Sequence, residues 1–371
     1  MNSDERRAAR RERREERRRE KKLERNEGRT LDAIADLDAL WKAQKQAGRG
    51  VGWKASVQGY QINALANIVK ARRDLLEGND VCRGFVHFDL VERGKRRHIS
   101  AVHYSERVIH KSLTQNVLVP CIQPRLIHSN SANIKGRGID YALDLLKRQL
   151  VRHYRKYGES GYILLMDFSD YFANISHAPI KAFVEREVVD SRAVALAHHL
   201  TDAQGHVGLG LGSEPNQILA VAFPDPIDHF VVEMCGVEAY GRYMDDSYAI
   251  HDSKEYLQVV RLLAERKCAE LGIVVNPKKT QIVKLSKGFT FLKKRIYYSD
   301  TGRVVMNPCR EAVTRQRRRM KKQAALYRAG RMTYEQARQS YQSWRGSMLR
   351  LDAHRTVLAM DALFKELFDG K

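Results

Sequence analysis

Apolar residues recur with helical spacing over much of the N-terminal half of the chain. From Thr30 to Leu76, the runs LDAIADLDALWKAQKQ and YQINALANIVKARRDLLEG place them every three or four positions, and the second run closes on Gly78. This spacing indicates amphipathic helices, and a glycine after such a run is a common helix stop. The pattern returns in SERVIHKSLTQNVLVPCI and in GIDYALDLLKRQLVRHYRKYG, so we expect this half to be mainly helical.

Short alternating or apolar runs predict strands between these helices. CRGFVHFDLVERGKRRHISAV predicts two strands around an ERGK turn, and GYILLMDF predicts a short apolar strand that ends at Asp167. VEAYGRYMDDSYAIHDS predicts a hairpin with a tight turn at its two aspartates. The helical run EYLQVVRLLAERKCAELG follows, and IVVNPKKTQIVKL and FTFLKKRIYYSDTGRVVM predict further short strands. From about Asn307 the chain is helical and basic.

The first 29 residues are of low complexity, and their stretch RRAARRERREERRREKKLER is nearly all Arg, Glu and Lys. A segment of this composition has no apolar face to bury, so it is either disordered or a solvated helix crossed by salt bridges. Two functions fit it, an arm that holds RNA and a tail that confers solubility. We favour the arm because the excess charge is positive.

The charge of the whole chain changes the interpretation of these elements. Among 371 residues, 66 Lys and Arg outnumber 44 Asp and Glu, which gives a net charge of +22. Such an excess indicates a polyanionic partner, most simply nucleic acid, although a merely basic surface is the alternative. The apolar fraction of 43% allows a sizeable core.

Cysteine spacing and apolar run lengths bear on the cellular location. The five cysteines are scattered without a CxxC pair or a His spacing typical of zinc, which favours reduced thiols: Cys82, Cys121, Cys235, Cys268 and Cys309. The charged N-terminus lacks the apolar stretch of a signal peptide, so we expect none, and no apolar run approaches the roughly 20 residues of a membrane helix. We expect a cytoplasmic protein without membrane contact.

Three carboxylates stand at predicted strand ends, namely Asp167 and the adjacent pair Asp245 and Asp246. Like charges this close repel, and their burial is costly unless a cation lies against them. Mg²⁺ is a natural candidate, and two such ions about 3.5–4 Å apart serve in-line phosphoryl transfer. Asp pairs are common in ordinary turns, but here both motifs follow apolar strands in a strongly basic chain.

These motifs resemble reverse transcriptases, specifically the compact bacterial kind, and the resemblance covers about residues 50–350 in consistent order. MDFSDYFANISH is similar to the first catalytic motif of the family, which implies Asp167 as a metal ligand and the backbone carbonyl of Phe168 as another. YMDD is similar to the second, which implies Asp245 as a ligand and Asp246 as a supporting carboxylate. RNA-copying viral RNA polymerases usually carry Gly within this second motif, so the resemblance favours DNA synthesis.

The same resemblance implies a selector for deoxyribose at Phe172, five residues after Asp167. Reverse transcriptases keep a bulky steric gate at this position, where an aromatic ring would clash with a ribose 2′-OH. The alternative is a core aromatic residue beside Tyr171. We favour the gate because of its place in the motif.

The segment GLGLGSEPNQILAVAF lies between the two aspartate motifs and resembles the family's template- and nucleotide-positioning segment, a Gly-rich turn that leads into a helix. Backbone N–H groups at such a turn suit a phosphate. Gly212 and Gln217 are the implied contact residues. The motif GSEPNQ, from Gly212 to Gln217, is closer to the GxxxSQ motif of diversity-generating retroelement enzymes than to the SP motif of retron and group II intron enzymes.

Basic residues complete the implied nucleotide site. SANIKGRGIDYAL resembles a fingers motif, with Lys135 and Arg137 as triphosphate contacts, although each is also compatible with an ordinary surface charge. LGIVVNPKKTQI matches the family pattern LxxNxxKT, which implies that Lys279 protonates or steadies the leaving pyrophosphate. FTFLKKRIYYS stands where the family has a primer-grip hairpin with FLG, and Lys293 replaces that glycine.

The sequence thus predicts an α+β right-hand polymerase with fingers, a palm of antiparallel sheet plus helices, and a helical thumb. The expected parts are a basic arm (1–29), N-terminal helices and fingers (30–160), a palm (161–300) and a basic thumb (301–371). The predicted activity is RNA-directed DNA polymerase, a nucleotidyltransferase using two Mg²⁺ ions, with Mn²⁺ as a substitute.

The expected partners are an RNA template, a DNA or RNA primer and dNTPs, with a structured noncoding RNA or an accessory protein as further candidates. The setting is a bacterial or phage retroelement or an antiphage defence system. The alternatives are a basic RNA-binding protein with a polymerase-like palm, and a template-independent or protein-primed DNA polymerase of an abortive-infection system. The sequence leaves open the primer, the template and the oligomeric state.

Overall fold

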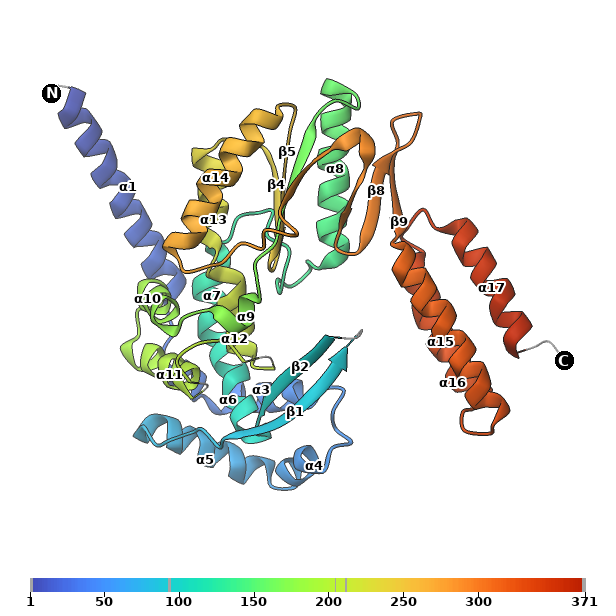
Figure 1. Ribbon diagram of the computed structural model, residues 1–371. Helices are drawn as coiled ribbons and strands as arrows, with labels where there is room; N and C mark the ends of the chain where they lie inside the picture. Colours follow the sequence, from blue (N-terminus) through green and yellow to red (C-terminus); the bar gives the residue numbers. More distant parts are fainter. Residues whose placement is uncertain (1–2, 93–94, 204, 211, 369–371) are drawn as a thin grey trace. The chain divides into compact units, whose positions relative to one another are not determined.

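The computed structural model describes residues 3–92, 95–203, 205–210 and 212–368, and it divides into two compact units. Unit 1 comprises residues 1–138, 168–234 and 264–275, and unit 2 comprises residues 139–167, 235–263 and 276–371. Helix α14 (Lys254–Glu270) contributes to both. Figure 1 gives the element labels that follow.

Unit 1 is mainly helical and holds one two-stranded antiparallel sheet, formed by β1 (Phe85–Glu92) and β2 (Lys95–Val102). Its helices are α1 (Ser3–Asn26), α2 (Leu31–Ile34), α3 (Leu37–Ala47), α4 (Ala55–Ile62), α5 (Ala64–Glu77), α6 (Tyr104–Leu113), η1 (Thr114–Leu118), α7 (Val119–Ile122), η2 (Gln123–Arg125), α9 (Tyr171–Asn174), α10 (His177–Glu187), α11 (Ser191–Asp202), α12 (Glu214–Ala222), α13 (Asp225–His229) and η3 (Phe230–Met234).

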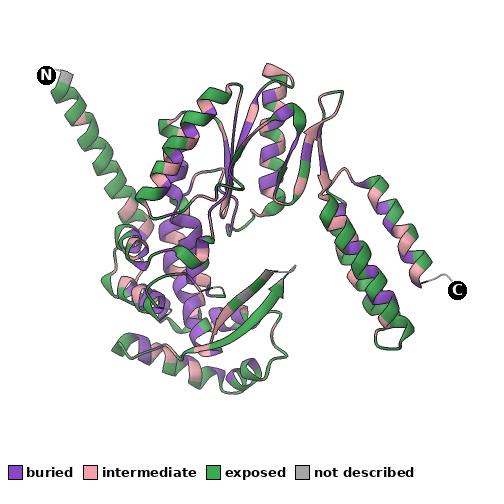
Figure 2. Ribbon diagram, viewed as in Figure 1, coloured by how far each residue is buried: buried purple, intermediate pink, exposed green. Residues whose placement is uncertain are grey.

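Local chemistry sets several of these boundaries. The carboxylate of Asp36 accepts the N–H of Ala39 and caps α3, because the first N–H groups of a helix have no partner within it. Helix α5 stops at Gly78, whose φ of +71° is left-handed and suits glycine, as the sequence predicts. The buried residues of unit 1 gather along α6, α7 and α12 (Figure 2).

Unit 2 is built on a four-stranded antiparallel sheet in the order β4-β5-β3-β6 and a three-stranded one in the order β7-β8-β9. The strands are β3 (Tyr162–Met166), β4 (Ala239–Tyr243), β5 (Asp246–His251), β6 (Gln281–Lys284), β7 (Phe289–Phe291), β8 (Lys294–Tyr298) and β9 (Val304–Pro308). The helices are α8 (Ile139–Tyr157), η4 (Leu285–Lys287), α15 (Arg310–Arg328), α16 (Tyr334–Met348) and α17 (His354–Phe368).

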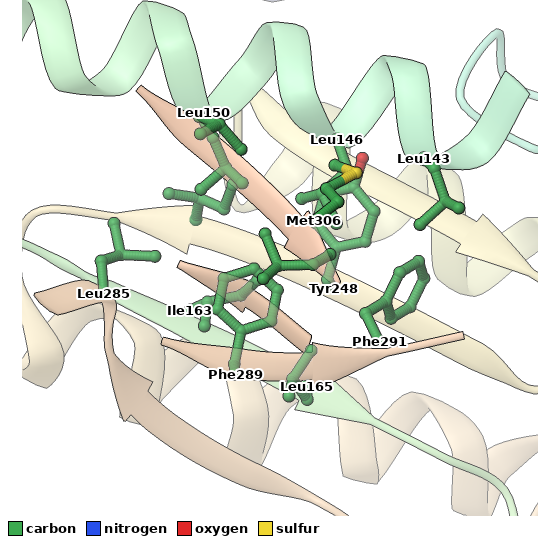
Figure 3. Close-up of a cluster of buried hydrophobic side chains, with 13 residues drawn as sticks. Leu143, Leu146, Leu150, Ile163, Leu165, Tyr248, Leu285, Phe289, Phe291 and Met306 are labelled. Carbon is green, nitrogen blue, oxygen red and sulfur yellow. The ribbon is translucent and has the colours of Figure 1, made fainter. Parts of the chain in front are cut away.

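One apolar cluster joins α8 to both sheets of unit 2. Leu146 on α8, Ile163 on β3 and Ile296 on β8 have no exposed surface, and Figure 3 shows these elements meeting around Tyr248 and Phe291. A separate cluster built around Met320, Tyr341 and Phe364 holds α15, α16 and α17 together. The buried strands β3 and β5 are thereby fixed from behind, while their ends lie outside this apolar cluster.

The predicted α+β class is confirmed, since every sheet is antiparallel and helices surround them. The predicted strand pairs around residues 85–102 and 239–251 form, and Ser3–Asn26 is a helix, one of the two states expected for the basic segment. All five cysteines are free thiols. No described helix is both long enough and apolar enough to cross a membrane.

Candidate active site

The three predicted carboxylates meet at one end of the four-stranded sheet in unit 2. Met166, the last residue of β3, pairs with Ser247 of β5, which brings Asp167 alongside Asp246 at the start of β5. Asp246 in turn pairs with Tyr243 across the hairpin, and Met244 and Asp245 form the two-residue turn between them. Strand register therefore places side chains about 80 residues apart in sequence at a single site.

The β4–β5 hairpin holds its turn in a strained conformation. Met244 has a φ of +57°, in the left-handed region that non-glycine residues rarely adopt. The guanidinium of Arg242, which is only 2% exposed, donates a hydrogen bond of 2.9 Å to the carbonyl of Met244. This hydrogen bond from a buried arginine thus helps fix the backbone of the turn directly before Asp245.

Glycine at position 241 is explained by its cross-strand partner, Tyr248. A Cβ at Gly241 would lie 2.6 Å from the Tyr248 hydroxyl oxygen. That hydroxyl donates to Gln149 Oε1 at 2.6 Å, and Gln149 Nε2 donates to the carbonyl of Tyr240 at 3.2 Å. The ring and the amide lock β4 and β5 to α8, and only glycine leaves room for them.

Asp167 is clasped by the turn that precedes β6. Asn276 Nδ2 donates to Asp167 Oδ1 at 3.0 Å, and Lys279 Nζ donates to Asp167 Oδ2 at 2.8 Å. The backbone N–H of Asn276 also donates to the Asp167 carbonyl at 2.7 Å. The hydrogen bond to Asp167 raises the pKa of the Lys279 ammonium. Both oxygens of this 4% exposed residue therefore have a donor, one of them cationic.

Asp246 experiences the opposite balance. Burial first, and then the negative charges of Asp245 and Asp167, raise its pKa to about 7, against the smaller effects of Lys279 and Lys293. These two ammonium groups therefore do not offset the negative charge gathered here. Carboxylate oxygens are the ligands that Mg²⁺ prefers, so the donor set and its unbalanced charge fit a divalent cation.

The predicted residues Phe168 and Phe172 belong to unit 1. Phe168 is 4% exposed and forms a bridge with Val275, whereas Phe172 is half-buried. The neighbour of Phe172, Tyr171, is the core aromatic: it is 5% exposed and its hydroxyl donates to the carbonyl of Ala220 at 2.8 Å. The carbonyl of Phe172 accepts the N–H of Leu209 at 2.7 Å, which fixes its backbone.

The Gly-rich segment forms the expected turn into a helix, also in unit 1. Gly212 has a φ of +112° and is followed by Ser213 at the N-cap of α12. Gln217 is exposed on the second turn of α12, while Asn216 is 2% exposed and donates to the carbonyl of Gly210 at 3.3 Å. Of the two polar residues, Gln217 is the one accessible to a ligand.

A buried polar chain that sequence reasoning missed supports this turn. Ser213 Oγ lies 3.3 Å from His110 Nδ1, and His110 Nε2 lies 3.2 Å from a carboxylate oxygen of Glu106. None of the three is more than 2% exposed. The spacing of Glu106 and His110 by four residues is a weak sequence signal, but the approach of Ser213 depends on tertiary packing.

The two predicted basic contacts of the fingers differ in their surroundings. Arg137 Nη1 donates to the carbonyls of His128 and Asn130 at 3.0 and 2.8 Å, so this guanidinium shapes its own loop. Lys135 is exposed. The carboxylates and Lys279 are thus brought together within unit 2, and the remaining predicted residues are found in unit 1.

One further group of potential metal ligands lies in unit 1, where the ligand atoms of Asp80, Cys82 and His199 all fall within 4.8 Å of one another. Cysteine spacing gives no sign of it, because His199 is distant in sequence. His199 Nε2 lies 2.8 Å from Asp80 Oδ1, and burial raises the pKa of the Cys82 thiol to about 12. A hydrogen bond between two exposed side chains, beside a thiol whose pKa is raised, accounts for the group.

The comparisons with known proteins agree with the motifs. The model of the reverse transcriptase (RNA-dependent DNA polymerase) family matches residues 88–296, more than half of the chain, so the chain belongs to this family. All three carboxylates and Lys279 lie within the matched residues. No curated protein sequence matches the chain.

Among solved structures, the chain is similar to telomerase from Candida albicans in complex with a TWJ fragment of telomeric RNA. The sequence identity is 12% and the TM-score is 0.45. The match covers 74% of this chain and 54% of the telomerase chain, so the chain spans about half of that protein's length.

Proposed function

We propose that the chain is an RNA-directed DNA polymerase that extends a DNA or RNA primer with dNTPs on an RNA template. The observation that carries this proposal is the convergence of Asp167, Asp245 and Asp246, with Lys279 against them, at one sheet end. Family membership gives the general class, and this cluster gives the chemistry. The right-hand arrangement of fingers, palm and thumb remains part of the proposal.

Asp167 and Asp245 would hold divalent cations, with the Phe168 carbonyl as a further ligand and Asp246 at the edge. Two Mg²⁺ ions, or Mn²⁺ in their place, would supply charge stabilisation for the attacking and leaving oxygens of the transferred phosphoryl group. Asn276 and the β6 turn keep the Asp167 oxygens oriented, because a carboxylate held by donors on both oxygens cannot rotate freely.

The remaining residues would bind and orient the nucleotide. Lys279 keeps its proton at neutral pH, since its pKa is raised, and is suited to steady a pyrophosphate leaving group. Gly212 and Gln217 would position the nucleotide or template. Lys135 and Arg137 would contact the triphosphate, and in this role Arg137 acts mainly through the loop that it shapes.

Primer extension on an RNA template with dNTPs and Mg²⁺ tests the activity. Wild type should extend the primer, and Asp245→Asn should reduce the rate by at least about 100-fold because a cation ligand is lost. Asp252→Asn removes an exposed carboxylate near the other end of β5 and should leave the rate unchanged. Equal inactivity of wild type and Asp245→Asn, under conditions where a control enzyme works, would refute the proposal.

The steric gate is tested by comparing dNTPs with rNTPs in the same assay. Phe172→Ala should increase the use of rNTPs relative to dNTPs, because removal of the ring leaves room for a 2′-OH. Phe172→Tyr keeps the ring and should preserve the preference of the wild type. Wild type that uses rNTPs as readily as dNTPs would show that Phe172 is not a gate.

Two biological settings accompany this proposal, a diversity-generating retroelement and an antiphage defence system. The motif from Gly212 to Gln217 favours the diversity-generating retroelement. In the second, synthesis could be untemplated or protein-primed. A template–variable repeat pair in the neighbouring DNA would support the first, and a structured noncoding RNA gene among defence genes would support the second.

A basic RNA-binding protein that keeps the palm without turnover is the non-enzymatic alternative. The joint presence of Asp167, Asp245, Asp246 and Lys279 argues against it. Extension by wild type, and its loss in Asp245→Asn, excludes this alternative.

A further inference from the structure

Helix α1 divides its charges between two faces. Ten Arg and two Lys stand among its 24 residues. Five of them recur at alternating intervals of three and four residues, and at 3.6 residues per turn they fall within an arc of about 80°. We call this row the basic stripe: Arg7, Arg10, Arg14, Arg17 and Lys21. The opposite face carries Glu5, Glu12, Glu16 and Glu20.

The side chains of the basic stripe are accessible to solvent. All five stripe residues are exposed, and Figure 2 shows α1 exposed along almost its whole length. Among the described residues, Arg10, Arg14, Arg17 and Lys21 form no ion pair. The stripe therefore presents its charge to solvent rather than consuming it in salt bridges along the helix.

The last turn of α1 is anchored in unit 1. Asn26 Nδ2 donates to the carbonyl of Glu187 at 2.9 Å, and Asn26 Oδ1 accepts the N–H of Val189 at 2.9 Å. Arg25 forms an ion pair of 3.6 Å with the buried carboxylate of Glu187 and donates to the carbonyl of Cys121. Such anchoring holds the orientation of the stripe relative to unit 1, which a disordered tail would not achieve.

The spacing and composition of α1 also exclude two kinds of partner for the stripe, a second copy of α1 and a membrane surface. Intervals of three and four residues are those of a coiled-coil seam, but a seam needs apolar residues, and arginines at these positions would repel a second copy of α1. A helix that lies on a membrane needs a broad apolar face, whereas Leu23 is the one large apolar residue of α1. The charge instead complements a stiff polyanion.

We propose that the basic stripe of α1 binds the phosphate backbone of a double-stranded segment of RNA. The stripe extends over roughly 21 Å at 1.5 Å per residue, which suits a stiff backbone better than a compact anion. Arginine predominates over lysine, and its planar guanidinium binds phosphate through two hydrogen bonds. RNA rather than DNA is chosen because the proposed function makes RNA the template, so this step rests on that function.

The acidic face gives the interaction a direction. Carboxylates repel phosphates, so RNA can approach α1 from the stripe side alone. The position of each charge around the helix therefore matters, not only the net charge. This consequence separates a docking surface from a solubilising tail, in which any arrangement of the same residues would serve.

A charge-preserving exchange tests this point. The swap variant combines Arg10→Glu with Glu12→Arg and Arg17→Glu with Glu16→Arg, which leaves the composition and net charge of the chain unchanged. We expect its affinity for an RNA hairpin of arbitrary sequence to fall at least tenfold at about 0.15 M salt, measured by fluorescence anisotropy. The slope of log K against log salt should decrease by about 2, one for each arginine that the swap removes from the stripe.

A matched control leaves the stripe intact. Glu12→Gln with Glu16→Gln alters the opposite face and should bind RNA as tightly as wild type or more tightly. Circular dichroism checks that each variant keeps its helix. Three results would overturn the inference: a swap variant within twofold of wild type, equal stripe-dependent affinity for a DNA hairpin of the same sequence, or displacement of the RNA from the stripe by poly-glutamate at equal charge concentration.

The experiments distinguish failure of this inference from failure of the polymerase proposal. Binding is measured without turnover, in an Asp245→Asn background as well as in wild type. If wild type binds RNA through the stripe but synthesises no DNA, the proposed function is refuted and this inference stands. Normal synthesis on a short annealed primer–template, together with unchanged RNA binding by the swap variant, would sink this inference alone.

Discussion

Asp167 directly follows β3 and Asp246 begins the neighbouring strand β5, so both lie at the same end of one sheet, yet their surroundings differ. Asp167 receives Asn276 on one oxygen and Lys279 on the other, so its charge is stabilised within the fold. Asp246 is half-buried beside two carboxylates, and its pKa rises to about 7. The comparison shows that one side of the site is balanced by protein groups, while the other retains negative charge that suits a cation.

The largest effect is expected from removing the ammonium group of Lys279 beside Asp167. Lys279→Met should lower the rate of nucleotide incorporation by about 100-fold, because the nearly buried Asp167 loses a charged donor and the pyrophosphate loses its proposed cationic partner. Steady-state primer extension measures this rate. Lys278→Met changes an exposed neighbour and should alter the rate less than about twofold. Equal losses in the two variants would show that general basicity, not the ion pair with Asp167, matters.

The unbalanced side predicts a pH-dependent stability. Between the usual pKa near 3.8 and about 7, folded Asp246 keeps a proton that the unfolded chain releases, so its contribution to stability falls as the pH rises through this window. In EDTA, Asp246→Asn should therefore stabilise the protein at pH 8 by a few kcal/mol, on the scale of about 1.4 kcal/mol per pKa unit.

Thermal unfolding of wild type and Asp246→Asn at pH 4 and pH 8 measures this difference. The stabilisation should shrink at pH 4, where the folded wild type keeps its proton and the unfolded chain, close to its own pKa, has begun to bind one as well. A difference that is the same at the two pH values would mean that Asp246 is not buried among like charges.

A smaller effect is expected from the neutral donor to Asp167. Asn276→Ala should lower the free energy of unfolding by about 1–2 kcal/mol and slow incorporation about tenfold, since Asp167 Oδ1 loses its amide and the turn loses its hydrogen bond to Lys278 N. Denaturant unfolding and primer extension measure the two quantities. Asn276→Asp should cost more than Asn276→Ala, because it adds a like charge beside Asp167; the reverse order contradicts the hydrogen-bonding role.

The smallest effect concerns the β7–β8 turn, which carries Lys293 near Asp246. Leu292 and Lys293 have φ values of +45° and +61°, so the hairpin forms in a left-handed conformation although glycine is absent. Lys293→Gly should stabilise the protein by up to about 1 kcal/mol. Lys287→Gly, outside such a conformation, should destabilise it by about 0.5–1 kcal/mol. A loss of stability in Lys293→Gly, measured by chemical denaturation, would contradict the backbone strain at this position.

The sequence predicts those parts of the site that depend on local pattern. Asp167 and the Asp245–Asp246 pair stand out because each lies in a short sequence motif that follows an apolar strand. The pairing of Lys279 with Asp167 was not predicted, since it depends on the register of β6 against β3. Arg242 was missed because a buried arginine under a turn looks like any basic residue in a chain with 66 Lys and Arg.

The helices and hairpins were predictable for the same reason, because spacing and stop residues such as Gly78 act locally. The chain Glu106–His110–Ser213 and the approach of His199 to Asp80 join segments far apart in sequence, and only packing brings them together. In the β7–β8 turn, Lys293 stands where the sequence resemblance leads one to expect glycine, and it adopts the left-handed conformation that glycine would favour.

The most direct test of a cation site is a titration of the protein with Mn²⁺, followed by electron paramagnetic resonance of the free ion. The account predicts that wild type and Asp252→Asn bind Mn²⁺ alike, that Mg²⁺ displaces it, and that Asp167→Asn and Asp245→Asn each lose affinity by about tenfold or more. Identical Mn²⁺ binding by all four proteins would contradict the claim that these carboxylates form the site.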